Sequence, residues 1–162
     1  MSIETVRAFF REKGREGDIL EFNVSSATVE LAAAAVGVIP ARIAKTLSFS
    51  VNGGCVLIVA AGDAKIDNSK FKAQFHCKAK MLSADEVIYF TGHAVGGVCP
   101  FGVNSSDVAT YLDISLRRFD TVYPAAGSAN SAIELTCGEL EELSASAGWV
   151  DVCKAWQDEP FN

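Results

Sequence analysis

The sequence lacks the features of several large classes of protein. Its longest apolar run, LAAAAVGVIPA at 31–41, contains Pro40 and is shorter than the roughly 18 residues that span a bilayer. The first residues carry charges throughout and do not form the apolar centre of a secretory signal. The five cysteines form no C-x-x-C pair, and the two histidines lack zinc-finger spacing. We therefore expect a cytoplasmic protein with neither a disulfide framework nor a metal site.

Disorder is also disfavoured, because 49% of the 162 residues are hydrophobic and only four are proline. This length suits a single domain over residues 1–162 with one core. Strand and helix patterns interleave irregularly along the chain. We therefore expect a mixed α/β (α+β) fold rather than a doubly wound repeat.

Apolar spacing, capping residues and terminal glycines predict the regular elements. Helices are predicted at 2–13, 29–36, 67–75, 84–91 and 137–146, with N-caps at Thr28, Ser83 and Thr136. Strands are predicted at 19–24, 44–51, 55–62, 79–82, 110–116, 120–124 and 131–136. The turn at 52–54 joins two of these strands as a hairpin. The almost continuous apolar run at 55–62 predicts a strand buried on both faces.

The net charge of −6 is spread unevenly. Residues 119–162 hold one basic and eight acidic side chains, whereas residues 42–118 hold nine basic and six acidic ones. Within the central part, Asp63 and Asp67 face a group of five lysines: Lys65, Lys70, Lys72, Lys78 and Lys80. Such a group can attract phosphates even in an acidic protein. A solvated helix face explains the same charges equally well, so both interpretations stay open.

One stretch, GHAVGGVCPFG at 92–102, holds four glycines in eleven residues. It contains no G-x-G-x-x-G motif, and no Walker lysine follows it. What remains is a G-x-x-x-P pattern from Gly96 to Pro100. Paired glycines let backbone amides come close to a ligand, and such amides can stabilise an oxyanion. On this stretch alone, an ordinary surface turn is the simpler interpretation.

Lys45 lies within RIAKTLSFS, an otherwise apolar and hydroxyl-bearing strand. A lysine at such a position either extends its ammonium to the surface or points into a cleft as a fixed cation. The pattern alone does not choose between the two.

Four segments carry a resemblance to a known family: ARIAKTLSF, VGGVCPFG, VYPAAGS and IELTCGELEEL. Together they closely resemble the YbaK/aminoacyl-tRNA deacylase family, which includes the editing insertion domain of bacterial prolyl-tRNA synthetases. The similarity extends over residues 17–145. It implies an α/β fold around a mixed, partly closed sheet, without metal or other cofactor. It also implies hydrolysis of the ester that joins a wrong amino acid to tRNA, with aminoacyl-tRNA and prolyl-tRNA synthetase as partners.

The resemblance implies roles for individual residues. Lys45 would hold the substrate end near the ester or the terminal phosphate, and Gly96 and Gly97 would offer backbone groups to the aminoacyl moiety. The substrate-binding positions would be Thr28, Val98, Cys99, Pro100, Phe101, Gly127 and Ser128. The tRNA-binding positions would be Lys70, Lys72, Lys78 and Lys80.

One position departs from part of the family. Relatives that act on cysteinyl-tRNA carry an aspartate where this chain has Ala132. The difference favours the alanyl-tRNA(Pro) type or a less characterised subgroup. We therefore expect a trans-acting deacylase for tRNA(Pro) that carries a small amino acid.

We expect water to attack the ester carbonyl while Lys45 and the loop amides stabilise the developing charge. No side chain is an obvious general base, but a terminal ribose hydroxyl of the substrate could orient the water. His93 is expected to be exposed in its turn. One alternative makes Cys99 a nucleophile with His93 as its base. Another is a non-catalytic module that binds tRNA or other nucleic acid, although Phe71 and Phe75 are the only aromatics in the lysine region and fit a core better.

Overall fold

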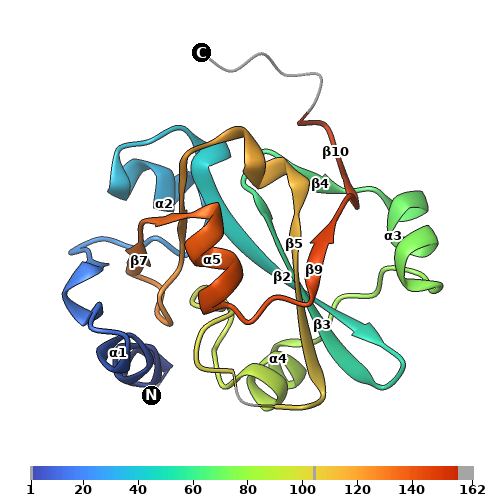
Figure 1. Cartoon of the computed structure of the whole chain (residues 1–162), viewed down its shortest axis with the longest axis horizontal. Coiled ribbons are helices and arrows are strands. Elements are labelled where there is room, and N and C mark those ends of the chain that lie inside the picture. Colours follow the sequence, from blue (N-terminus) through green and yellow to red (C-terminus); the bar gives the residue numbers. More distant parts are fainter. Residues whose placement is uncertain (1, 104, 157–162) are drawn as a thin grey trace.

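The computed structural model describes residues 2–103 and 105–156. A curled six-stranded sheet with the order β8-β6-β2-β3-β5-β9 forms its centre (Figure 1). Its strands are β2 (Ile43–Val51), β3 (Gly54–Ala61), β5 (Val108–Asp113), β6 (Thr121–Pro124), β8 (Leu135–Thr136) and β9 (Gly148–Val150). β2 is antiparallel to β3 but parallel to β6, and β3, β5 and β9 run parallel to one another. The expected mixed α/β fold is therefore confirmed.

Helices and two small strand pairs surround this sheet (Figure 1). The helices are α1 (Ser2–Glu12), α2 (Val29–Val36), α3 (Asn68–Phe75), α4 (Ala84–Thr91) and α5 (Cys137–Leu143), with short 3-10 turns at Glu16–Asp18, Pro40–Arg42 and Ile114–Arg118. The antiparallel strand pairs are β1 (Ile19–Glu21) with β7 (Ser131–Ile133), and β4 (Lys65–Ile66) with β10 (Cys153–Lys154). None of the helices in the described ranges has the length and apolar character needed to cross a membrane.

The central hairpin and the buried strand follow the sequence closely. Asn52 and Gly53 both have positive φ, at 53° and 82°, which is the geometry of a tight turn between strands with the usual twist. Residues 55–61 of β3 are all buried, which confirms that both faces of this strand are covered.

The core extends from this sheet to the helices on both sides. Val6 and Phe10 of α1 are completely buried, and the Phe10 ring packs edge-on against Phe101 with 5.0 Å between centroids. Phe71 of α3 and Leu140 of α5 complete the same cluster. The end of the glycine loop is therefore held by the amino-terminal helix.

All three predicted helix caps are confirmed. The Thr28 hydroxyl accepts the Leu31 N–H at 3.2 Å, and Ser83 and Thr136 each begin a complete capping box. These caps fix where α2, α4 and α5 begin.

The structure corrects several predicted strands and one helix end. The predicted strand at 131–136 is divided at the exposed Glu134, because β7 pairs with β1 whereas β8 pairs with β6. At 79–82 only an isolated bridge forms, between Met81 and Phe49. The last helix ends at Leu143 rather than near 146, and the chain then returns to the sheet as β9. In each case long-range pairing overrides the local pattern.

Candidate active site

A cavity of about 330 Å³ lies where β2, the start of α2, the glycine loop and the segment around β7 meet. Its lining is mostly aliphatic, and the polar residues that contribute to it are Ser26, Thr28, Lys45, Thr46, Ser48, Tyr123 and Ser131. Lys45 is the one charged residue that lines it within the described chain. The size and the mixture of apolar walls with few polar groups are typical of a small-molecule site.

Lys45 points into the fold rather than extending to the surface. It is half-buried on β2, and its Nζ donates hydrogen bonds to the carbonyl oxygens of Gly62, at 3.3 Å, and Ala64. Burial lowers the pKa of this ammonium, and the carboxylates of Asp63 and Glu30 oppose that effect. Of the two interpretations of Lys45, the structure supports the fixed cation in a cleft.

Gly62 supports this lysine and was not predicted as a site residue from the sequence. A Cβ at this position would lie 2.1 Å from the carbonyl oxygen of Pro40, so no other residue fits without backbone movement. The close approach brings the end of β3 under the 3-10 turn at Pro40–Arg42, and the Gly62 carbonyl then faces Lys45.

The two adjacent glycines of the loop have different roles. Gly96 lines the cavity and has a φ of +99°, a conformation that side chains disfavour. Gly97 does not line the cavity, but a Cβ there would lie 2.8 Å from the Cα and N of Ser128. Gly97 therefore allows the loop to pack directly on the backbone at Ser128, and this contact places Gly96 and Val98 in the cavity wall.

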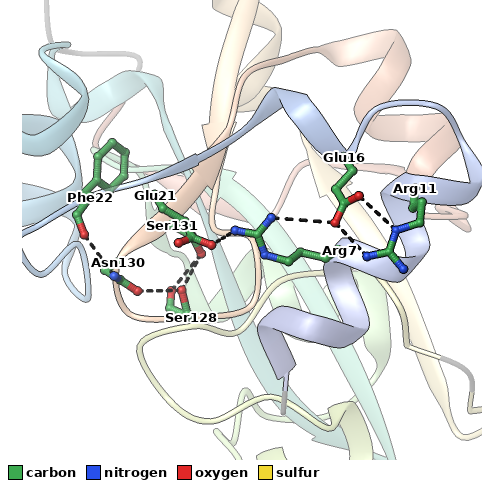
Figure 2. Close-up of polar contacts among 8 residues, drawn as sticks. All are labelled: Arg7, Arg11, Glu16, Glu21, Phe22, Ser128, Asn130 and Ser131. Carbon is green, nitrogen blue, oxygen red and sulfur yellow. Dashed lines mark hydrogen bonds and ion pairs between the residues drawn. The ribbon is translucent and has the colours of Figure 1, made fainter.

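The segment at 127–131 forms the opposite side of this contact. Figure 2 shows the polar contacts that hold this segment. The Ser128 hydroxyl lies 2.7 Å from Ser131 Oγ and 2.9 Å from Asn130 Oδ1. Asn130 Nδ2 donates to the carbonyl oxygen of Phe22 at 3.0 Å. Ser131 lines the cavity, whereas Gly127 and Ser128 lie behind it. The second predicted segment therefore supports the pocket rather than lining it.

Ion pairs connect the amino-terminal helix to this wall (Figure 2). Arg7 of α1 pairs with Glu21 of β1 and lies 3.9 Å from Glu16, which also pairs with Arg11 at 2.9 Å. β1 in turn pairs with β7, which carries Ala132 into the cavity lining. The position that distinguishes this chain from its cysteinyl-tRNA relatives therefore lies in the cavity wall.

His93 and Cys99 are buried in the loop interior, which corrects the expectation that His93 is exposed. His93 Nε2 lies 2.9 Å from the Phe101 carbonyl oxygen and 3.6 Å from Cys99 Sγ. Because a carbonyl can only accept, Nε2 donates here. Burial lowers the pKa of His93 and raises the pKa of the Cys99 thiol to about 12. A thiol with this pKa holds its proton at neutral pH, and neither residue lines the cavity.

The structure divides the predicted site residues into two groups. Those that line the cavity are Thr28, Lys45, Gly96 and Val98. Those that lie outside the lining are Gly97, Cys99, Pro100, Phe101, Gly127 and Ser128. Several lining residues were not predicted from the sequence: Ser26, Thr46, Met81, Leu82, Val87 and Tyr123. Tyr123 belongs to the quoted segment VYPAAGS and Thr46 to ARIAKTLSF, so these segments could have identified them, but the other four carry no signal in a single sequence.

The predicted lysine group is divided as well. Lys70 Nζ contacts Asp151 Oδ1 and the Cys153 carbonyl oxygen, both at 3.0 Å. Lys72 and Lys78 are exposed and line a second cavity of about 330 Å³ together with Asn68, Ser69 and Ala79. Lys80 is exposed beside them in sequence. Across residues 2–103 and 105–156, no three His, Cys, Asp or Glu side chains are grouped so that they could hold a metal ion.

Comparisons with known proteins agree with this arrangement. Residues 24–143 match the family described as the aminoacyl-tRNA editing domain. The uncharacterized protein YwhH of Bacillus subtilis (strain 168) is 58% identical over 158 residues, which is 97% of this chain and 100% of YwhH. The proline--tRNA ligase of Thermotoga sp. (strain RQ2) is 29% identical over 93 residues, which is 57% of this chain but only 16% of the ligase.

A solved structure shows the same fold over almost the whole chain. It is described as a candidate trans-editing enzyme for prolyl-tRNA synthetase, and it superposes with a TM-score of 0.84 at 28% identity, over 94% of this chain and 97% of that one. The match to the family includes the lysine strand, the glycine loop and the β7 wall. This chain is therefore a member of the aminoacyl-tRNA editing domain family, and its resemblance to YbaK-type domains is confirmed.

Proposed function

We propose that this protein is a trans-acting deacylase that hydrolyses the ester of a mischarged tRNA, in particular tRNA(Pro) that carries a small amino acid. The observation that carries the proposal is a single half-buried cation, Lys45, in a small and mostly apolar cavity with Gly96 in its wall. Family membership and the trans-editing relative support the same activity.

The site supports a mechanism of positioning and electrostatics. A water molecule attacks the ester carbonyl carbon, and Lys45 and the amides of the loop at Gly96 stabilise the negative charge on the carbonyl oxygen. The bond from the acyl carbon to the ribose oxygen then breaks, and the proton from water goes to that ribose oxygen. Because no Asp, Glu or His lines the cavity within the described residues, a neighbouring ribose hydroxyl of the substrate is the group that can pass this proton.

The dimensions of the cavity favour a small acyl group. Ala132 and Ala32 line it with short side chains, and no carboxylate among the described residues is available to select a polar or cationic side chain. Synthetase pockets discriminate amino acids that differ by one methylene by only about 1–3 kcal/mol, so a second hydrolytic site is needed for small substrates. This combination supports alanyl-tRNA(Pro) as the first substrate to test.

A deacylation screen tests the proposed function. Purified protein is incubated with alanyl-, cysteinyl- and seryl-tRNA(Pro), and prolyl-tRNA(Pro) serves as the control that should remain intact. We expect release of alanine at a rate well above spontaneous hydrolysis. Binding of these tRNAs without release of any amino acid would instead support a non-catalytic binding module.

Replacement of Cys99 by serine tests the alternative of a cysteine nucleophile. The Cys99 thiol is fully buried, and its pKa of about 12 leaves almost no thiolate at neutral pH. We expect Cys99→Ser to change kcat by less than about threefold, since a nucleophile's loss typically costs several orders of magnitude. Cys55→Ser, at another buried cysteine outside the loop, controls for the effect on packing. If Cys99→Ser lost turnover while Cys55→Ser kept it, the result would support Cys99 as the nucleophile.

The exposed lysines of the second cavity, Lys72 and Lys78, are expected to contact tRNA phosphates. Replacing both Lys72 and Lys78 by alanine should weaken binding of uncharged tRNA and lower the slope of log K against log salt by about one for each lysine. Lys70→Ala is the matched control, because Asp151 already pairs with Lys70. Binding titrations at several salt concentrations measure the slope, and equal slopes for the double variant and wild type would contradict the contact.

A further inference from the structure

The edge of β2 that faces away from β3 is covered along most of its length but not at the cavity. At Ala44 this edge pairs with Pro124 of β6. At Ser48 it is covered again, where the Ser48 carbonyl accepts the Leu82 N–H at 3.2 Å. The strand positions between these two partners, including Thr46, line the cavity instead.

The alternation of the strand shows which backbone groups face this gap. The Ser48 carbonyl and the Ser50 N–H both bond to the segment at 80–82, so the even positions direct their backbone groups away from β3. The N–H and C=O of Thr46 therefore point to the same edge, inside the gap. Among the described residues, neither group has a partner strand there. The Thr46 hydroxyl is buried and also has no hydrogen-bond partner within residues 2–103 and 105–156.

A second unpartnered hydroxyl lies in the cavity lining. Ser26 is only 8% exposed, and its Oγ has no hydrogen-bond partner in the part of the chain that the structure describes. Its backbone is fixed, because the Ser26 N–H donates to the Ala129 carbonyl oxygen at 2.6 Å. The serine side chain can still turn between staggered rotamers. The next residue, Ala27, packs against the glycine loop, where its Cβ would be 3.4 Å from a Cβ at Gly96.

Unpaired polar groups of this kind are rare in folded proteins, because burial removes them from water and nothing replaces the lost hydrogen bond. Here a strand position and two hydroxyls without partners occur around one cavity. No carboxylate lines that cavity in the described chain, so an amino group that enters it can donate only to hydroxyl and carbonyl oxygens. The backbone N–H and C=O of Thr46, with the hydroxyls of Thr46 and Ser26, therefore match a ligand that carries both a hydrogen-bond donor and an acceptor.

We infer that the Thr46 edge of β2, together with the Ser26 hydroxyl, is the hydrogen-bonding subsite for the α-aminoacyl group. An aminoacyl ester has an amino group and a carbonyl on one carbon, as a single residue of a strand has. It can therefore form with Thr46 the reciprocal pair of an antiparallel ladder, in which its amino group donates to the Thr46 C=O and its carbonyl oxygen accepts the Thr46 N–H. This pairing presents the ester carbonyl next to Lys45. The inference rests on the proposed deacylase function.

Thr46→Pro tests the backbone contact. Proline removes a strand N–H, and it is tolerated where that N–H faces an open edge. Since the Thr46 N–H is not in the β2–β3 ladder, we expect the variant to fold, with kcat/KM for alanyl-tRNA(Pro) reduced at least tenfold. Leu47→Pro is the matched control: it removes an N–H that faces Ile58 of β3, so it should unfold the protein. Folded Thr46→Pro protein with wild-type kcat/KM would overturn the inference.

Two hydroxyl deletions keep the test decisive if Thr46→Pro fails to fold. Thr46→Val and Ser26→Ala remove hydroxyls that have no partner, so the midpoint of thermal unfolding should stay the same or rise. kcat/KM should nevertheless fall by about threefold or more in each variant. Ser131→Ala is the control for a structural hydroxyl, because Ser131 bonds to Ser128, and its unfolding midpoint should fall.

The outcomes separate this inference from the proposed function. An active wild type with weakened Thr46→Val and Ser26→Ala variants supports both. If the wild type is active and both hydroxyl variants keep its kcat/KM, the subsite is wrong and the deacylase function stands. If the wild type releases no amino acid from any tested tRNA, both are wrong.

Discussion

Replacing Lys45 by alanine is expected to lower the rate of deacylation by about 100-fold or more and to leave the fold intact. Lys45 is the one charged residue in the described cavity lining, and fixed charges that stabilise an oxyanion away from water typically contribute 100- to 1,000-fold. Single-turnover hydrolysis of alanyl-tRNA(Pro) measures the loss, and thermal unfolding measures the fold. Lys154→Ala, at an exposed lysine of β10, should leave the rate unchanged. If Lys45→Ala hydrolysed alanyl-tRNA(Pro) at the wild-type rate, the proposed role of Lys45 would be wrong.

The pH dependence gives this prediction a second readout. Because burial lowers the pKa of Lys45, its ammonium loses its proton at a lower pH than an exposed lysine does. Activity that depends on this charge should therefore decline on the alkaline side before the ordinary lysine range is reached, once spontaneous ester hydrolysis is subtracted. Arginine stays charged at any such pH, so the residual activity of Lys45→Arg should lack this decline. A decline of the same kind in both enzymes would assign it to another group.

Replacing Gly97 by alanine is expected to have the second large effect, through packing rather than chemistry. The added Cβ would lie 2.8 Å from the Cα and N of Ser128, and neither side of this contact is a side chain that could rotate away. The loop must therefore move, and forced overpacking of this kind costs about 1–3 kcal/mol. Since Gly96 and Val98 line the cavity on either side of Gly97, we also expect at least a tenfold loss in kcat/KM.

Gly138→Ala is the matched control for Gly97→Ala. Its added Cβ would have Thr136 Oγ1 at 3.9 Å as its nearest neighbour, and the position lies in the first turn of α5. Alanine exceeds glycine in helix propensity by about 1 kcal/mol, so the unfolding midpoint should stay the same or rise. Unfolding curves and deacylation rates of the two variants check the pair. Equal stability and activity of Gly97→Ala and wild type would show that the loop does not depend on this contact.

Much of the local structure could be predicted because its causes lie close together in the sequence. The caps at Thr28 and Ser83 act on backbone groups three residues later, and the turn at Asn52–Gly53 needs only the conformational freedom of those two residues. The apolar run of β3 likewise predicted its own burial. The split of 131–136 between two sheets could not be predicted in this way, because its cause is the separate positions of β1 and β6.

The glycine loop shows the same division at the site. Its sequence identified the segment, but not which of its residues reach the cavity. Phe101 fits the core against Phe10, and burial of Cys99 and His93 follows from that packing. Only Gly96 and Val98 of the predicted loop residues remain in the cavity wall. A pattern of residue types cannot distinguish a loop residue that lines the cavity from one that packs into the core, since small and apolar residues occupy both kinds of position.

By itself, the sequence determined the class of fold, the helix caps, the central hairpin and the family, because these depend on short-range bonding and on motifs that stay together in the chain. The tertiary structure alone decided that Lys45 turns inward to Gly62, that Gly97 meets Ser128, and that β2 is left uncovered at Thr46. Each of these features arises where segments distant in sequence end or approach one another. The physical reason is that a cavity consists of the space that such segments leave unfilled, and this space depends on how they pack.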